Sequence, residues 1–78
     1  MPSALFTDPR PAARLGNLIR TARVDRGMRQ EDLARRSEIA TATLRRIERG
    51  EGTGPSVFVV IRLLEELDLG VEHLNAVT

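Results

Sequence analysis

The sequence predicts an all-α domain of four or five short helices. Apolar residues recur at helical spacing in several stretches, which are separated by glycine, proline or a short polar turn. A chain of 78 residues forms a single domain with one modest core, which buries about 60% of the surface of the unfolded chain. With two Phe and no Trp or Tyr, that core must consist mainly of Leu, Ile, Val and Ala.

Residues 1–10 are predicted to form a flexible N-terminal arm. Three of the first eleven residues are proline, which supports neither a helix interior nor a sheet ladder. Arg10 in this arm could contact a phosphate backbone or enter a minor groove of DNA. The alternative is a disordered tail without a binding role.

Residues 11–78 are then the folded domain, and its first helix is expected to run from Pro11 to about Arg26. Proline is tolerated in the first turn of a helix, and Gly27 is a suitable residue to end one. The side chains at i, i+3, i+4 and i+7 that would face the core are Leu15, Leu18, Ile19 and Ala22.

Residues 30–50 predict two short helices, about 30–37 and 41–49, that meet at a tight turn. The side chains expected to pack the two helices together are Leu33, Ala34, Ile39, Leu44 and Ile47. The opposite face of the second helix carries Thr41, Ala42, Arg45 and Arg46, with Arg49 at its end. Short polar residues and arginines outside a buried stripe suit a helix that enters a major groove. We therefore predict a DNA-binding helix-turn-helix.

The distribution of charge agrees with this prediction. Residues 1–50 contain eleven Arg and six acidic residues, a net charge of +5, whereas residues 51–78 contain one Arg and five acidic residues, a net charge of −4. The basic half contains the predicted helix-turn-helix, as a phosphate-binding surface requires. Arginines on a helix face are often only a solvated surface, and it is the helix-turn-helix spacing that favours DNA.

Other classes of function find little support. The chain has no Cys, and its one histidine, His73, has no cluster of ligands at metal-binding spacing, so we expect no metal and no cofactor. No nucleophile and base stand out as a catalytic set, so we do not expect an enzyme. We find neither a membrane-spanning run nor a signal peptide, and we therefore expect a cytoplasmic protein.

The C-terminal third predicts a helix with more apolar surface than one core can use. Ser56 can cap it, and i, i+3/i+4 spacing over twelve residues favours a helix over a strand for 57–68. The stripe expected to face the core is Val57, Val60, Ile61, Leu64 and Leu67. The residues left for a dimer interface are Phe58, Val59 and Leu63, joined by Leu69 and Val71 from a final segment that forms either a helix or a strand across the dimer axis.

Three motifs resemble the Xre/Cro-type helix-turn-helix family of phage repressors and bacterial regulators. They are R-x-x-x-G-M-R-Q-E-D-L-A at 23–34, T-L-R-R-I-E-R-G at 43–50 and P-S-V at 55–57, and the resemblance covers residues 15–69. Two positions depart from the family pattern. Glu38 replaces the usual turn glycine and would need a left-handed backbone, and Ala40 replaces the usual Ser or Thr cap, so that Thr41 could become the cap.

The resemblance, which extends to phage λ repressor-like domains, implies roles for individual residues. Base contacts would come from Gln30, Thr41, Ala42, Arg45 and Arg46. Of these, Arg46 is the preferred guanine reader, and Gln30 would contact a phosphate or a base edge. Phosphates would be held by Arg29, Thr43 and Arg49. Arg23 and Glu48 occupy the positions of a partly buried structural ion pair.

The resemblance also implies a function. We expect a bacterial or phage-encoded homodimer that binds a palindromic operator on double-stranded DNA, with half-sites about 34 Å apart. Small members of the family commonly repress their own operon, as phage regulators, restriction-modification controllers or antitoxins. The C-terminal part is loosely similar to antitoxins of the HipB type. The alternative is a protein-interaction module whose main role is to bind and neutralise a toxin or other partner protein.

Overall fold

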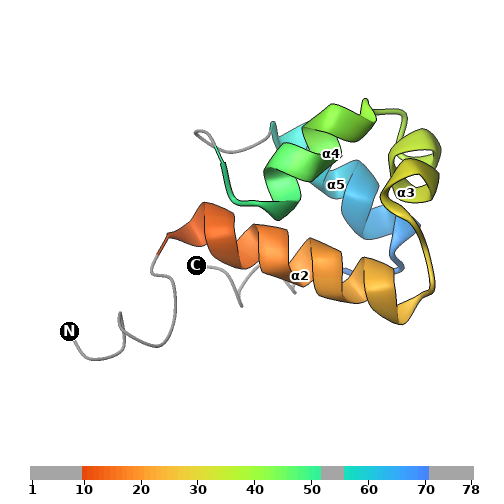
Figure 1. Ribbon diagram of the computed structural model, residues 1–78, viewed down its shortest axis with the longest axis horizontal. Helices are drawn as coiled ribbons and strands as arrows, with labels where there is room; N and C mark the ends of the chain where they lie inside the picture. Colours follow the sequence, from red (N-terminus) through yellow and green to blue (C-terminus); the bar gives the residue numbers. More distant parts are fainter. Residues whose placement is uncertain (1–9, 52–55, 71–78) are drawn as a thin grey trace.

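The structure is a computed structural model that describes residues 10–51 and 56–70. These residues form four helices: α2 (Pro11–Asp25), α3 (Gln30–Arg36), α4 (Thr41–Glu48) and α5 (Val57–Glu66). The described part of the chain contains no strand, and the predicted all-α fold is confirmed. Helix α2 runs along the lower edge of the view in Figure 1, and α3 and α4 lie above α2. Helix α5 lies behind α4 in this view. None of the described helices is long and apolar enough to cross a membrane.

The core draws on all four helices. Its fully buried large side chains are Ile19, Leu33, Leu44, Leu63, Leu64 and Leu67. The predicted stripe of α2 is largely correct, since Leu15, Ile19 and Ala22 are buried and Leu18 is half-buried against the core. Leucine and isoleucine thus supply most of the apolar area that is removed from water on folding, as the composition predicted.

A glycine allows α2 to approach α4 closely. A Cβ atom on Gly16 would collide with the carbonyl oxygen of Ile47 and would lie 2.8 Å from that of Glu48. A side chain at this position would therefore push the two helices apart. The close approach brings the end of α4 against the middle of α2, and this contact sets the orientation of α4.

All four helices end in the same hydrogen-bonded turn, with a left-handed residue just beyond the end. At the end of α3, the N–H of Ile39 donates to the carbonyl of Ala34 (3.0 Å) and the N–H of Glu38 to that of Arg35 (3.1 Å). This is the Schellman arrangement. The left-handed residues are Gly27 (φ 68°), Glu38 (φ 60°), Gly50 (φ 70°) and Asp68 (φ 59°). The predicted left-handed backbone of Glu38 is confirmed.

Helix α4 starts at residue 41 as predicted, but Thr41 is not its cap. Ala40 is the N-cap residue, and its carbonyl accepts the first bond of the helix from the N–H of Leu44 (3.2 Å). Thr41 is therefore the first helical residue, and no side chain caps α4. The buried positions of Leu44 and Ile47 fix the register of the helix regardless of the missing cap. The residues on the outer face of α4, beginning at Thr41, therefore keep their predicted positions along the helix.

The rotation of α5 about its axis differs from the prediction. The side chains that face the core are Val60, Leu63 and Leu64, followed by Leu67, whereas Val57 and Ile61 are 66% and 36% exposed. The first turns of α5 are apolar on nearly every side, so the periodicity of the sequence could not distinguish two neighbouring stripes. The observed rotation buries Leu63 in place of the smaller Val57, which removes more apolar surface from water.

This rotation corrects the predicted dimer interface. Leu63 was expected at the interface but is fully buried in the protein's own core, so that assignment is wrong. Val59 and Leu69 are half-buried and pack against the same core, while Phe58 is 75% exposed. Val71, and with it the choice between a final helix and a final strand, lies outside the described residues, as do residues 1–9 of the predicted arm and the histidine at position 73.

Ser56 caps the start of α5, as predicted. The Oγ atom of Ser56 accepts a hydrogen bond from the N–H of Val59 (3.2 Å), which satisfies one of the unpaired amides in the first turn of α5. A helix therefore starts here despite the β-branched residues that follow, and the strand alternative for 57–61 is excluded.

Candidate nucleic-acid interface

Helix α4 has one face fixed in the protein and the other exposed to solvent. Leu44 and Ile47 are buried, and they hold the helix against α2 and α3. The residues on its outer side that are exposed are Ala42, Thr43, Arg45 and Arg46, followed by Arg49 at the end of the helix, while Thr41 is half-buried. The structure thus brings the predicted base-reading residues of α4 onto one continuous surface of about two helical turns.

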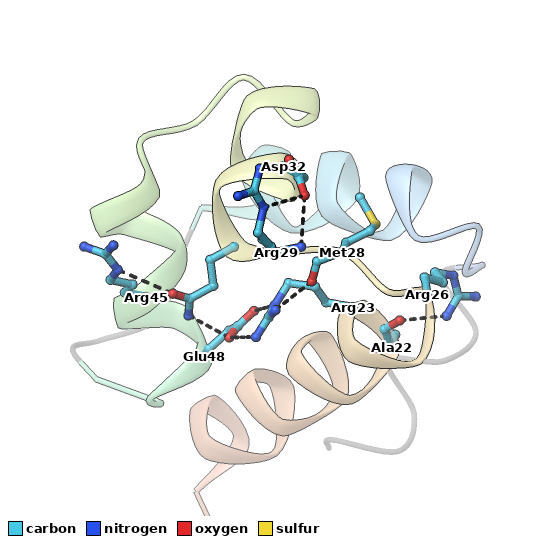
Figure 2. Close-up of polar contacts among 9 residues, drawn as sticks. Ala22, Arg23, Arg26, Met28, Arg29, Asp32, Arg45 and Glu48 are labelled. Atoms are coloured by element: carbon cyan, nitrogen blue, oxygen red, sulfur yellow. Dashed lines mark hydrogen bonds and ion pairs between the residues drawn. The ribbon is translucent and has the colours of Figure 1, made fainter.

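A partly buried ion pair ties α4 to α2. The Nε and Nη2 atoms of Arg23 lie 2.7 and 3.0 Å from the two carboxylate oxygens of Glu48 (Figure 2). Only 12% of the Arg23 side chain and 3% of the Glu48 side chain are exposed. The Nη1 atom of Arg23 also donates to the carbonyl oxygen of Met28 (2.8 Å), which lies between α2 and α3. The predicted ion pair is therefore present, and it connects three segments of the domain.

Gln30 extends this network to the outer face of α4. Its Nε2 atom donates to Glu48 Oε1 (3.0 Å), and its Oε1 atom accepts from Arg45 Nε (3.4 Å). The sequence predicted Gln30 as a residue that contacts DNA, but it did not predict either of these bonds. Gln30 is 18 residues from Glu48 and 15 from Arg45, and only the crossing of α3 and α4 brings the three side chains together.

The remaining arginines of the predicted surface differ in their partners. The side chain of Arg46 is exposed and forms no hydrogen bond or ion pair with any residue of 10–51 or 56–70. Arg29 Nε lies 3.4 Å from Asp32 Oδ2, and Arg49 Nε lies 3.2 Å from Glu51 Oε2, with the arginine side chains 77% and 61% exposed. Exposed pairs of this kind are weak, so both guanidiniums can exchange a carboxylate for a DNA phosphate.

Asp32 has a separate role at the start of α3. Its Oδ2 atom accepts from the backbone N–H of Arg29 (3.1 Å), and this hydrogen bond, more than the Arg29 side chain, lowers the pKa of the Asp32 carboxyl. The side-chain hydrogen bond to Asp32 in turn raises the pKa of the Arg29 guanidinium. Because the folded state favours the ionised carboxyl, Asp32 supports α3 near neutral pH and loses this effect as the pH falls through its lowered pKa.

The part of the chain that the structure describes contains no candidate metal site. Within 10–51 and 56–70, no group of three or more His, Asp or Glu side chains could hold a metal ion. Arg10, which was predicted to contact phosphate, is exposed and directly precedes α2. Its carbonyl oxygen accepts hydrogen bonds from the N–H groups of Ala13 and Arg14 in the first turn of α2 (3.2 Å each).

Comparison with known families agrees with this geometry. A family model described as helix-turn-helix matches residues 19–74, which is more than half of the chain. The chain belongs to the Xre/Cro-type helix-turn-helix family. In this Xre/Cro-type domain, α3 and α4 form the helix-turn-helix and α4 is its second, exposed helix. The protein is accordingly a DNA-binding helix-turn-helix regulator. A search of curated proteins found no significant match.

Proposed function

We propose that this protein is a homodimeric repressor that binds an inverted-repeat operator and controls its own operon. The observation that carries the proposal is the arrangement of α4, which is anchored by Leu44 and Ile47 and presents Arg45, Arg46 and Arg49 to solvent. A helix held in this way can enter a major groove without moving relative to its domain. Guanidiniums on its outer face can then contact base edges and phosphates.

The dimeric part of the proposal is supported by the exposed side of α5. Val57, Phe58 and Ile61 are 66%, 75% and 36% exposed, and they follow one another along one side of the helix. Large apolar side chains grouped on a surface usually mark a contact, and an identical copy is the commonest partner of a small domain. We propose that this face, defined by Val57, Phe58 and Ile61, is the centre of the dimer interface.

Selection from a random duplex library tests the proposal as a whole. The purified protein should enrich an inverted repeat whose half-sites lie about 10 base pairs, or 34 Å, apart, because a two-fold dimer places its two α4 helices in successive major grooves. Enrichment of a single half-site would support sequence reading but contradict the dimer. Recovery of no common sequence would contradict the proposed repressor.

Phe58→Glu is expected to convert the protein to a monomer and to weaken its binding to the selected operator. The carboxylate would have to be buried without a partner in the proposed interface, although it is tolerated at a site that is 75% exposed in the single chain. Sedimentation velocity measures the oligomeric state, and Val24→Glu, at another exposed apolar residue (59%), is the matched control. A dimer that persists in Phe58→Glu would contradict the assignment of this face as the dimer interface.

Arg46→Ala is expected to reduce discrimination at one base pair of each half-site. A bidentate contact from arginine to guanine distinguishes that base pair by about 1–3 kcal/mol, which is the effect the mutation should remove. Affinities for the operator and for its single-base variants measure this effect. An equal loss of affinity for operator and random DNA would instead identify Arg46 as a phosphate contact.

A further inference from the structure

We propose that Gln30 is a positioning residue for Arg45, and that Glu48 fixes the orientation of the Gln30 amide that holds Arg45. In this assignment Gln30 does not itself read a base. It connects the buried Arg23–Glu48 ion pair to the guanidinium of Arg45 on the outer face of α4, so that Arg45 becomes a prearranged base reader. The inference rests on the proposed function and names a specificity determinant of the same site.

The chemistry of its two neighbours fixes the orientation of the Gln30 amide. The oxygens of Glu48, which accept hydrogen bonds from Arg23, must face the amide nitrogen, at 3.0 Å from Nε2. Arg45 donates only, so it must face the amide oxygen, at 3.4 Å from Oε1. Turning the amide over would place oxygen against carboxylate and nitrogen against guanidinium, and both contacts would be repulsive. Each neighbour therefore enforces the same orientation.

Glu48 is itself held firmly enough to act as the reference point. Its side chain is 3% exposed, and its carboxylate accepts from Nε and Nη2 of Arg23 as well as from Gln30. Arg23 is in turn bonded to the carbonyl of Met28. A carboxylate with these partners has little freedom to move, so the position of the Gln30 amide is set by the interior of the protein.

This orientation changes what Gln30 and Arg45 can do in a major groove. A glutamine reads adenine by presenting both its oxygen and its nitrogen, and in Gln30 both atoms are already engaged. Arg45 uses only Nε toward Gln30, and its Nη1 and Nη2 groups have no acceptor among the described residues. In Figure 2 the guanidinium of Arg45 extends away from the ion-pair network with these groups outermost. The N–H groups of Nη1 and Nη2 can together bind the O6 and N7 acceptors of guanine.

A double-mutant cycle on DNA binding tests the connection. Gln30→Met keeps the length and helix propensity of the side chain but removes both hydrogen bonds. We expect it to weaken binding to the selected operator by about three- to tenfold, through lost ordering of Arg45, and to reduce discrimination at the base pair affected by Arg45→Ala. In the Arg45→Ala background, Gln30→Met should have no further effect. Arg46→Ala is the matched control, and its effect should add to that of Gln30→Met.

Other outcomes of the cycle overturn the assignment. If Gln30→Met and Arg45→Ala have additive effects, Gln30 contacts the DNA independently. If Gln30→Met leaves affinity and discrimination unchanged, Gln30 does not position Arg45. Far-ultraviolet circular dichroism of Gln30→Met confirms that the variant being measured is folded.

A measurement without DNA separates this inference from the proposed function. In the nuclear magnetic resonance spectrum of the free protein, the Nε–H of Arg45 should exchange with water more slowly than that of the unbonded Arg46, and the difference should vanish in Gln30→Met. Equal exchange of the two groups in the unmutated protein would overturn the inference even if the protein binds its operator. Slow exchange of Arg45 in a protein that selects no operator would contradict the proposed function and leave the positioning contact standing.

Discussion

Glu48→Ala is expected to lower the free energy of unfolding by about 3–5 kcal/mol, because it leaves Arg23 as a mostly buried charge without its partner. The same mutation removes the acceptor for Gln30 Nε2, which adds to the cost. A domain of this size has a total stability on the order of 5–15 kcal/mol, so the variant should lose a large share of its stability. Urea denaturation followed by circular dichroism measures the change.

The control for this prediction is an ion pair of the same charge type on the surface. Arg49 lies 3.2 Å from Glu51, with both side chains at least half exposed. Arg49→Ala should therefore change the stability by about 0–1 kcal/mol. Equal effects of Glu48→Ala and Arg49→Ala would contradict the description of the Arg23–Glu48 pair as the connection that holds α4 on α2.

Leu63→Ala is expected to lower the free energy of unfolding by about 2–5 kcal/mol, the second large effect. Leu63 is fully buried between α5 and the rest of the core, so the mutation removes apolar contacts and leaves a cavity. The control is Val24→Ala on α2, an apolar side chain that is 59% exposed and should contribute less than about 0.5 kcal/mol. Both are measured by urea denaturation at a fixed protein concentration.

The Leu63 variant also decides between two rotations of α5. If Leu63 were an interface residue and Val57 a core residue, Leu63→Ala would change the oligomeric state and leave the stability of the single domain nearly intact. A stability loss without a change in sedimentation is the result that the structure predicts. A change in sedimentation at unchanged stability would contradict the buried position of Leu63.

Features decided by short stretches of sequence were predicted well. The helix from Pro11 to the turn at Gly27, and the two helices around Glu38, follow from apolar spacing, the first-turn proline and the C-terminal glycine. The same spacing gave the outer face of α4, because burial of Leu44 and Ile47 leaves its arginines outside. The Arg23–Glu48 pair was expected only through the family resemblance, and the structure contains it.

Features that depend on several segments at once were not predictable in this way. Periodicity could not choose the buried stripe of α5, since that helix is apolar on adjacent sides and the choice is made by how leucines fill the core. The bonds of Gln30 depend on the crossing of α3 and α4 and on side-chain rotamers. The start of α4 at Thr41 was predicted, but the suggested role of Thr41 as its cap was wrong, because burial of Leu44 and Ile47, and not a capping hydroxyl, fixes that helix.

If the outer face of α4 reads the sequence of DNA, a titration with two duplexes should reveal it. The protein is titrated against the duplex upstream of its own coding sequence and against a scrambled duplex, each at two salt concentrations. We expect at least about 1000-fold preference for the upstream duplex, and an affinity for both duplexes that falls steeply with salt as counterions are released. Equal and weak binding to the two duplexes would contradict the claim and favour a module that binds a partner protein.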